Sequence, residues 1–310
     1  MIRETGSEIT RDPRAVLTTG TFDGVHLGHR AILTYLVERA RLVGGIPTLV
    51  TFDPHPREVI AGVHVPLLTT MRERADLAEA IGIERFVVLP FTRDLSNLEP
   101  EAYVSDVLLG TVGMKEIVIG YDHRFGRKAR GDREVLEQLG REHGFSVDVI
   151  PEQIATGVTV SSTKIRQRLA AGDVERAEAL LGRPYAFGGT VVRGAGRGRT
   201  IGFPTANVQP EHPRKLIPGV GVYAVRVQLG EGAGSVEGMM NVGRRPTFEE
   251  DGALKAEVHL FETDADLYGR HVDVTVVARI RDERRFDGPD ALVAQLREDR
   301  QRARWLLAGS

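Results

Sequence analysis

The chain of 310 residues contains no cysteine. This absence excludes disulfide bridges, a thiolate nucleophile and any zinc site built on cysteine ligands. The sequence also lacks a strong excess of charge of either sign, because 41 basic residues stand against 43 acidic ones. Such a balance gives no general attraction to nucleic acid or anionic lipid, although a local basic loop could still bind a small phosphorylated ligand.

Long hydrophobic runs are absent as well. The first residues, MIRETGSEITRDPRA, contain no apolar segment of a secretory signal, and no uninterrupted apolar run approaches the length of a membrane span. Hydrophobic residues still make up 41% of the chain, which is enough to form a core. We therefore expect a soluble cytoplasmic protein without a membrane or nucleic-acid partner, and the length favours two domains.

The first half of the chain alternates short apolar runs with segments of helical periodicity. Helices between strands are typical of right-handed crossovers, so the pattern predicts an α/β fold of Rossmann-like type, a parallel sheet with helices on both faces. Ligands bind such sheets beyond the carboxyl ends of the strands. The predicted strands are AVLTT, PTLVTF, RFVVLPF, EIVIG and FSVDVIP; the predicted helices are residues 29–43, RERADLAEAIGI up to Gly82, EAYVSDVLLGTVG and DREVLEQLGREHG.

The pattern changes from about Pro184 onward. The segments VYAVRVQL and HVDVTVVARI alternate apolar and polar residues, and glycine-bearing turns separate them from AEVHLFE and SVEGMMNV. This alternation predicts an antiparallel barrel or sandwich, followed by an amphipathic helix at DALVAQLREDRQRARWLL. A helical stretch with breaks at Gly172 and Gly182 joins the two halves, so we expect domains at residues 1–183 and 184–310.

A turn with three glycines and two histidines, GTFDGVHLGH at residues 20–29, follows the first predicted strand. Glycine lets the backbone approach a ligand, and the helix that begins near His29 offers N–H groups and a positive dipole end to an anion. His26 and His29 would be neighbours on one helical turn and could both donate to one phosphate group. The alternatives are two polar residues without a role or, less favoured, a zinc site.

Two further segments bear on that choice. His55 lies between two prolines just past the next predicted strand, where rigid backbone suits either a preorganised site or a simple turn. The segment VSSTKIR follows the last strand of the first half, and its serine and threonine residues are ordinary N-caps. Lys164 and Arg166, however, oppose the dipole of the helix that begins there unless an anion lies between them. This arrangement predicts a clamp for a polyphosphate.

The segment GAGRGRTIGFPTANV, residues 194–208, carries the clearest signal in the second half. Its glycine- and arginine-rich part could wrap phosphates or form a solvated turn, and it is not a Walker loop because no G-K-[ST] follows. Thr205 and Asn207 would share one face of an extended chain and could bind Mg²⁺ and its phosphates. Glu257 alternates with Val258 and Leu260; such a carboxylate is usually solvated, but a buried one could act as a general base.

The motifs HLGH at 26–29 and SSTKIR at 161–166 together resemble those of the nucleotidyltransferase superfamily. The resemblance implies that a phosphate nucleophile attacks the α-phosphorus of ATP and pyrophosphate leaves, without a covalent intermediate. It implies that His26 and His29 contact the ATP phosphates, and that Ser162, Thr163 and Arg166 hold the pyrophosphate. The further ligand-binding residues expected in this half are Gly20, Phe22, Asp23, Gly24, Gly28, His55 and Asp122.

The segments GRGRTIGFPTAN, GVYAV, NVGRRPTF and EVHLF, followed by DLYG and IRDERRF, resemble the riboflavin kinase family. In tandem with the first half they resemble the bacterial bifunctional riboflavin kinase/FMN adenylyltransferases, or FAD synthetases, over nearly the whole chain. The resemblance implies a second domain with a six-stranded antiparallel β-barrel and a C-terminal helix. It implies that Thr205 and Asn207 serve Mg-ATP, that Gly196 and Gly198 bind nucleotide, and that Glu257 deprotonates the ribityl hydroxyl that attacks the γ-phosphorus.

The segment YDHRFG, residues 121–126, departs from this family pattern, because His123 stands where the family tends to have an aromatic residue. We expect His123 to affect flavin or adenine contacts and to leave the phosphate motifs unchanged. The expected small-molecule partners are riboflavin, FMN and ATP, with Mg²⁺ as cofactor, and a homo-oligomer is left open. Two other functions also stay open here: an enzyme in which only the kinase half works, and a flavin-binding regulatory protein without chemistry.

Overall fold

The computed structural model describes the chain except for residues 121–122, 151–153, 156–157, 195, 231–233, 245–253, 264–265 and 310. Its backbone divides into two compact units, Met1–Ser161 and Ser162–Ser310. The helices α7 (Ser162–Ala170) and α8 (Val174–Leu181) group with the second unit, where α8 packs against strands of its sheet. The domain boundary at residue 183 stays a prediction.

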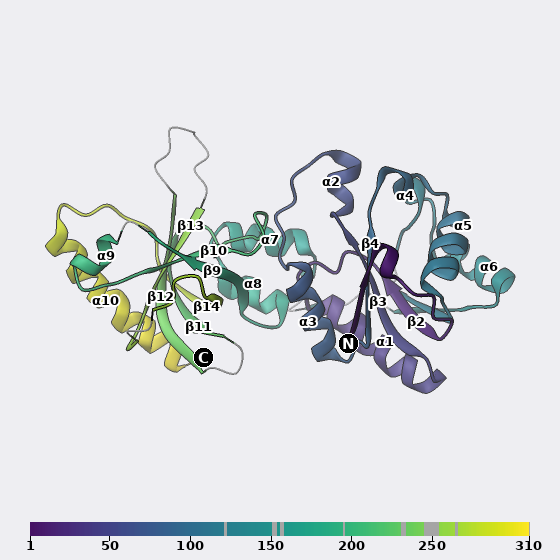
Figure 1. Ribbon diagram of the computed structural model, residues 1–310, viewed down its shortest axis with the longest axis horizontal. Helices are drawn as coiled ribbons and strands as arrows, with labels where there is room; N and C mark the ends of the chain where they lie inside the picture. Colours follow the sequence, from purple (N-terminus) through teal and green to yellow (C-terminus); the bar gives the residue numbers. More distant parts are fainter. Residues whose placement is uncertain are drawn as a thin grey trace. The chain divides into compact units, whose positions relative to one another are not determined.

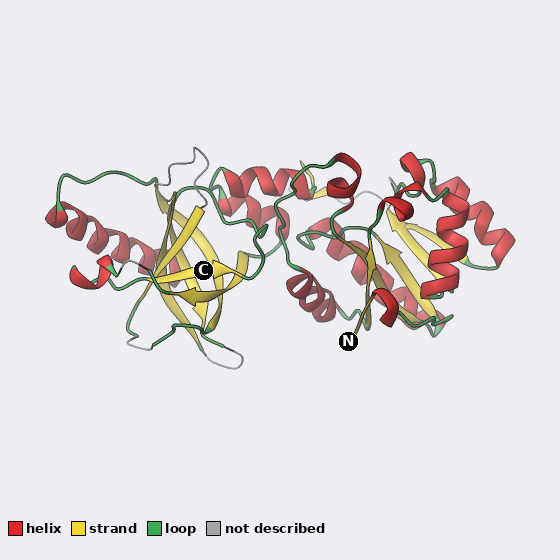
Figure 2. Cartoon of the chain, turned by 45° about the horizontal axis from the view of Figure 1, so that its top comes forward, coloured by secondary structure: helices red, strands yellow, loops and turns green. Residues whose placement is uncertain are grey.

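The first unit is built on a six-stranded parallel sheet with the order β1-β4-β3-β2-β5-β6, drawn as yellow arrows in Figure 2. The predicted parallel α/β fold is therefore confirmed. The edge strand β1 was not predicted, because only one of its four residues is buried and it shows no apolar run. The strands are β1 Ile2–Thr5, β2 Ala15–Thr19, β3 Ile46–Asp53, β4 Arg85–Pro90, β5 Glu116–Gly120 and β6 Ser146–Ile150.

Helices cover both faces of this sheet (Figure 1). On one face α1 (Leu27–Val43) and α3 (Met71–Ile81) bury apolar side chains at helical spacing against the strands. The π-helix η2 (Tyr103–Val112) and α6 (Arg133–His143) cover the other face. The shorter elements are η1 Gly6–Glu8, α2 Pro56–Ala61, α4 Arg93–Asn97, α5 Pro100–Ala102, η3 Arg127–Ala129 and the hairpin of β7 Ile154–Ala155 with β8 Val158–Thr159.

The second unit contains a closed antiparallel barrel with the strand order β10-β13-β12-β11-β14-β9, and a long helix packs against it. The predicted six-stranded barrel and C-terminal helix are confirmed. Strands β9 and β10 were not predicted from the pattern, because β9 contains two adjacent glycines and β10 is short and ends in proline. The elements are β9 Tyr185–Val192, α9 Arg197–Thr200, β10 Ala206–Pro210, β11 Gly221–Gln228, β12 Ser235–Arg244, β13 Leu254–Leu260, β14 His271–Arg281 and α10 Pro289–Ala308.

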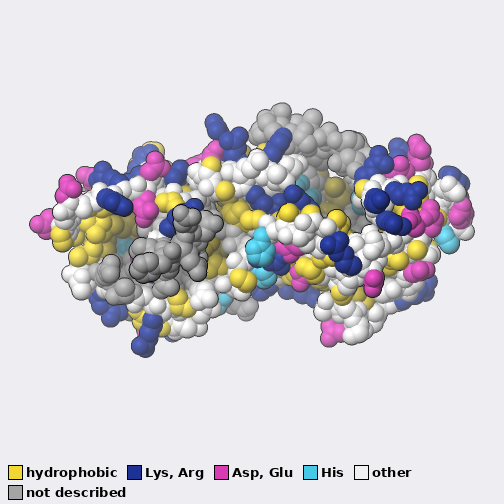
Figure 3. Space-filling view, turned by 90° about the horizontal axis from the view of Figure 1, so that it is seen from above, with side chains coloured by type: hydrophobic (Ala, Val, Ile, Leu, Met, Phe, Trp, Pro, Cys, Tyr) yellow, Lys and Arg dark blue, Asp and Glu magenta, His cyan; other side chains and the backbone are white. Residues whose placement is uncertain are grey.

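The surface carries mixed charge. Figure 3 shows basic and acidic side chains interspersed over one face of the molecule, as expected from the net charge near zero. Some form ion pairs, such as those of Glu99 with Arg127 and Arg130. None of the helices that the structure describes is long and apolar enough to cross a membrane.

Candidate active sites

The first site lies at the turn between β2 and α1, beyond the carboxyl end of a central strand. Phe22 and Val25 adopt φ angles of 46° and 39°, a left-handed region that such side chains rarely occupy. The turn also bonds to a neighbouring loop, because the backbone N–H of Gly24 donates to Thr69 Oγ1 at 3.0 Å. The surrounding structure therefore has to hold this backbone in place.

A buried ion pair between Asp23 and Arg74 helps to fix the backbone of this turn. Asp23 is fully buried, and its carboxylate accepts hydrogen bonds from the backbone N–H groups of Leu68 and Thr69 at 3.0 and 2.8 Å. Arg74, 1% exposed, donates to the same carboxylate at 3.2 Å and to Thr51 Oγ1 at 3.1 Å. The nucleotide-binding role predicted for Asp23 stays a prediction; in this structure its carboxylate joins the turn to α3 and the loop before it.

The two histidines of the turn lie against each other. His26 is the N-cap of α1, and its Nδ1 accepts a hydrogen bond from the backbone N–H of His29 at 3.3 Å. Because Nδ1 accepts, the ring proton of His26 resides on Nε2, which is thus an N–H donor. The two rings stack with centroids 3.6 Å apart, and Phe22 packs on His29 at 4.8 Å. The prediction that both imidazoles lie side by side is confirmed.

The ring of His29 is held in its neutral form. Burial lowers its pKa well below the ordinary value, and a positive charge on His26, when that ring is protonated, and on Arg74 lowers the pKa further. Its buried Nδ1 has no hydrogen-bond partner within the described part of the chain. A buried imidazole nitrogen without a protein partner at a helix N-terminus is suited to meet a ligand.

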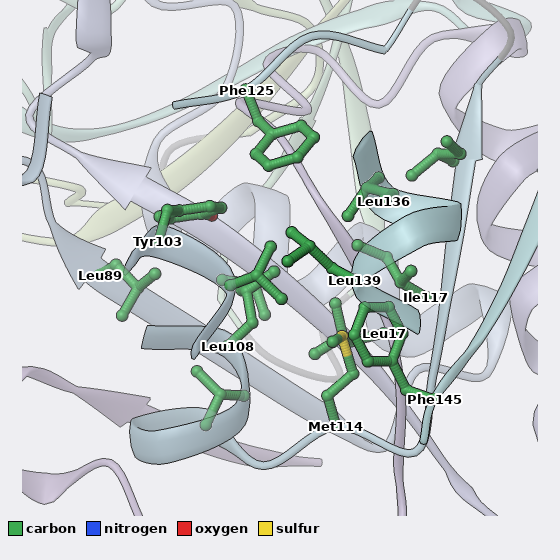
Figure 4. Packing of buried hydrophobic residues seen from close by; sticks show 14 of the residues in the cluster. Leu17, Leu89, Tyr103, Leu108, Met114, Ile117, Phe125, Leu136, Leu139 and Phe145 are labelled. Carbon is green, nitrogen blue, oxygen red and sulfur yellow. The ribbon is translucent and has the colours of Figure 1, made fainter. Parts of the chain in front are cut away.

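A cavity of about 670 Å³ opens beside this turn and includes Gly20 in its wall. Tyr103 and Phe125 contribute to the wall from the hydrophobic core, and their rings lie at one end of the core cluster in Figure 4. Phe52 and Phe91 add a second aromatic pair with centroids 5.3 Å apart. These phenylalanines were not predicted as site residues from the sequence, although both lie at the carboxyl ends of parallel strands, where ligands bind.

The other residues of the first half that were predicted to bind ligands do not all lie at this turn. His55 is the N-cap of α2, where its Nδ1 accepts from the backbone N–H of Arg57 at 3.2 Å, and Gly28 lies in the first turn of α1. His123 lines the 670 Å³ cavity, with its ring stacked on Phe125 at 5.9 Å. Asp122 lies outside the described residues.

The SSTKIR motif begins α7, as predicted, and this helix has no acidic residue in its first turn. Ser162, Thr163 and Arg166 all lie on this helix, which groups with the second unit. Their role in holding pyrophosphate stays a prediction.

In the second unit, strand register brings Asn207 and Glu257 together. They face each other across β10 and β13, and Asn241 pairs with Glu257 from the other side. Lys255 Nζ lies 2.7 Å from Glu257 Oε1, and the Glu257 side chain is 35% exposed. This carboxylate is therefore neither deeply buried nor simply solvated. It is paired and accessible.

Asn207 has the marks of a ligand-binding residue. It is 5% exposed, and its buried Oδ1 has no hydrogen-bond partner among the residues that the structure describes. Gly194 lies directly over this side chain, and a Cβ atom there would collide with the amide. Gly198 makes a similarly close approach, since a Cβ atom would collide with the carbonyl oxygen of Phe203. Gly196 precedes α9 in the left-handed conformation.

Two cavities meet at Thr205. One, of about 400 Å³, is lined by Val258 and Leu260, and the other, of about 320 Å³, by Glu257 and His259. Thr205 lines both. Glu257 thus faces away from Val258 and Leu260, as its alternation with them predicted. His259 lies on the same side as Glu257 and was not predicted as a site residue from the sequence.

Comparisons with known proteins cover both units. A family model described as FAD synthetase matches residues 8–164, and one described as riboflavin kinase matches residues 181–307. The bifunctional riboflavin kinase/FMN adenylyltransferase of Escherichia coli strain K12 is 41% identical over 291 residues, which cover 93% of this chain and 91% of the relative. The corresponding protein of Listeria monocytogenes is 36% identical over 300 residues, with 96% and 94% coverage.

One solved structure shares the fold over almost the full length. It is a Streptococcus pneumoniae protein described as a macrolide-efflux protein, with a TM-score of 0.87, 30% identity, and coverage of 98% of this chain and 99% of that chain.

Proposed function

This chain belongs to the family of bifunctional riboflavin kinase/FMN adenylyltransferases, and we propose that each of its two reactions uses the site described in one of its units. The chain phosphorylates riboflavin with ATP to FMN, and it adenylylates FMN with a second ATP to FAD. The observation that best supports the proposal is the occurrence of two different sets of groups suited to phosphates. One is the stacked pair His26 and His29, and the other is the buried Oδ1 of Asn207 together with the two cavities that share Thr205.

For FAD formation, we assign the ATP phosphates to the N-terminus of α1. A phosphate oxygen of FMN attacks the α-phosphorus of ATP, and the bond to the β-phosphate breaks as pyrophosphate leaves. Negative charge develops on the transferred phosphate, where helix N–H groups and the Nε2–H of His26 can stabilise it. Gly20, Phe22, Gly24 and Gly28 belong to the same turn and first helical turn.

We assign the flavin ring of FMN to the 670 Å³ cavity. Its volume suits a bound aromatic ring system, and four of its wall residues, Phe52, Phe91, Tyr103 and Phe125, offer apolar aromatic surface. Gly20 and Thr21 lie in the same wall, which connects this cavity with the phosphate turn. A flavin there would lie next to the proposed position of ATP. His123 would touch it, which agrees with the expectation from its place in the sequence.

For FMN formation, we assign Glu257 as the general base. It would take the proton of the terminal ribityl hydroxyl as that oxygen attacks the γ-phosphorus of ATP, and ADP would leave. We place riboflavin in the 320 Å³ cavity, which contains Glu257, and ATP in the 400 Å³ cavity on the other side of Thr205. Thr205 would then lie where the two substrates meet.

The residues of this site fit a magnesium ion. Mg²⁺ prefers a few protein oxygens together with substrate phosphates, and the buried Oδ1 of Asn207 and the hydroxyl of Thr205, two residues earlier in the chain, would offer such oxygens. The described part of the chain has no cluster of three or more histidine, aspartate or glutamate residues placed for a metal, so the phosphates would complete the coordination. When bound, Mg²⁺ would neutralise charge on the phosphates of ATP.

Magnesium titration tests this assignment. Asn207→Leu should raise the Mg²⁺ concentration needed for half-maximal binding of an ATP analogue by about tenfold or more, because it removes a ligand oxygen. Asn207→Asp, the matched control, retains that oxygen and should bind Mg²⁺ nearly as well as the wild type. Binding can be followed by calorimetry on the full chain with and without Mg²⁺. Equal Mg²⁺ dependence in all three proteins would contradict the assignment.

The remaining expectations from the sequence are part of the proposal. They are the pyrophosphate-binding role of Ser162, Thr163 and Arg166, the nucleotide-binding roles of His55, Asp122, Gly196 and Gly198, a cytoplasmic location, and an oligomeric state left open. FMN adenylylation by a Thr163→Val variant, with FMN supplied, tests the first of these.

A further inference from the structure

His259 holds the segment that ends at Thr205. This histidine follows Glu257 by two residues on β13, is 8% exposed, and packs against Phe203 with ring centroids 5.1 Å apart. Its Nδ1 lies 2.8 Å from the carbonyl oxygen of Pro204. Because a carbonyl oxygen can only accept, Nδ1 carries the proton and donates it to this bond.

The bond reaches a part of the chain that the barrel ladder does not hold. Strand β10 begins at Ala206, whose register partner is Val258, so the ladder starts just after Thr205. Pro204 has no N–H group and cannot donate to a ladder. The hydrogen bond from the His259 side chain therefore attaches Pro204 to β13, two residues before the first residue that the ladder holds. On its other side, the backbone N–H of Phe203 donates to the carbonyl of Gly198 at 2.9 Å.

We propose that His259 is a positioning residue of the kinase reaction, which fixes the Thr205 hydroxyl between the two substrate cavities through its hydrogen bond to Pro204. The proposal rests on the assignment of Thr205 to Mg-ATP made above. His259 itself exchanges no proton with the substrates. Burial lowers its pKa, and the nearby charge of Arg300 lowers it further against the raising effect of the Pro204 bond. The neutral ring thus has a single N–H, which is committed to Pro204.

Two substitutions separate this role from a packing role. His259→Phe retains an aromatic ring but removes the donor, whereas His259→Asn can place its amide N–H near the position of Nδ1. We expect His259→Phe to lower kcat for riboflavin phosphorylation by about 10- to 100-fold, since a displacement of about 1 Å at reacting groups has such an effect. The KM for riboflavin should change by less than about threefold, and His259→Asn should recover most of kcat.

The full-length protein supplies an internal control, because both variants should adenylylate added FMN at the wild-type rate. A second readout is the Mg²⁺ dependence of ATP-analogue binding by calorimetry, which His259→Phe should weaken and His259→Asn should restore. Wild-type kinetics in His259→Phe would overturn the proposal. So would an equal rise in riboflavin KM in both variants at unchanged kcat, which would make His259 a flavin contact.

Thr205→Ala distinguishes failure of the inference from failure of the proposed function. If Thr205→Ala phosphorylates riboflavin normally, the assignment of Thr205 to Mg-ATP is wrong, and the positioning role of His259 is refuted as well. If Thr205→Ala is inactive while His259→Phe is normal, only the positioning role is refuted.

Discussion

The two proposed sites of this chain would present groups to phosphates in different ways. In the first unit the groups come from a strand-to-helix turn, with a capping histidine, a second stacked histidine and the N–H groups of α1. In the second unit they come from barrel strands, where register places Asn207 opposite Glu257. The first set consists of backbone N–H groups and imidazole rings, and the second mainly of side-chain oxygens. Under the proposed assignments, this contrast predicts that direct donation would dominate at the first site, and that the second would depend on a cation between protein and phosphate.

The two sites also differ in what holds them. A fully buried ion pair between Asp23 and Arg74 fastens the first turn, in which two non-glycine residues have positive φ. In the second unit the corresponding attachment is the neutral hydrogen bond from His259 to Pro204. Loss of one partner of a buried ion pair leaves an uncompensated charge, whereas loss of a neutral hydrogen bond costs less. Loss of the attachment itself should therefore affect mainly the stability of the fold at the first site and mainly the reaction rate at the second.

The largest effect is expected from Glu257→Gln. Removal of the proposed general base should lower kcat for riboflavin phosphorylation by about 10²- to 10⁴-fold. Adenylylation of added FMN should be unchanged, because the first unit has its own site. Both rates can be measured by chromatographic separation of flavins. Lys255→Met is the matched control: it removes the ion-pair partner of Glu257 and should have a much smaller effect. An equal loss in both variants would assign the effect to the ion pair and not to the base.

Arg74→Met should destabilise the protein by about 3–5 kcal/mol, because it leaves the carboxylate of Asp23 buried without its cation. Urea unfolding monitored by circular dichroism measures this change. The double variant Asp23→Asn/Arg74→Met should be less destabilised than the sum of the single variants, since neither charge is then present. Strict additivity would show that the two residues act separately.

His26→Asn should lower the rate of FAD formation from added FMN by about 10²- to 10³-fold, the usual effect of removing one preorganised donor. Asparagine is itself a good N-cap, so α1 should retain its stability, whereas His26→Ala should also lose about 1 kcal/mol of stability. Riboflavin phosphorylation should be normal in both variants. If FAD formation is normal in His26→Asn but impaired in His26→Ala, His26 acts only as an N-cap of α1 and its donation to the phosphates is refuted.

The smallest effect concerns pH. The pKa of His29 is depressed in the folded protein. Above the ordinary histidine pKa of about 6.5, the His29 side chain is therefore neutral in both the folded and the unfolded state. As the pH falls through this value, the unfolded chain takes up a proton first, and the free energy of unfolding decreases toward the lower folded-state pKa. His29→Gln should weaken this dependence. Urea unfolding at about pH 7.5 and about pH 5.5 measures it; identical pH dependence in the two proteins would refute the interpretation.

Local patterns allowed much of this arrangement to be predicted. The turn at residues 20–29 could be placed at a helix N-terminus because its signals lie within ten residues, and the alternation around Glu257 gave the correct face. Partners that are distant in sequence could not be found: Arg74 lies 51 residues from Asp23, and the Pro204–His259 bond spans 55. Strand β1 was missed because an exposed edge strand has little apolar pattern.

The central claim is that the two sites work independently, and mixing two variants tests it most directly. Neither Glu257→Gln nor His26→Asn should make appreciable FAD from riboflavin, ATP and Mg²⁺ when incubated alone. Mixed in one tube, they should make FAD at a substantial fraction of the wild-type rate, because His26→Asn releases FMN that Glu257→Gln can adenylylate. No FAD from the mixture of two folded proteins, each active in its intact reaction when tested alone, would contradict the account.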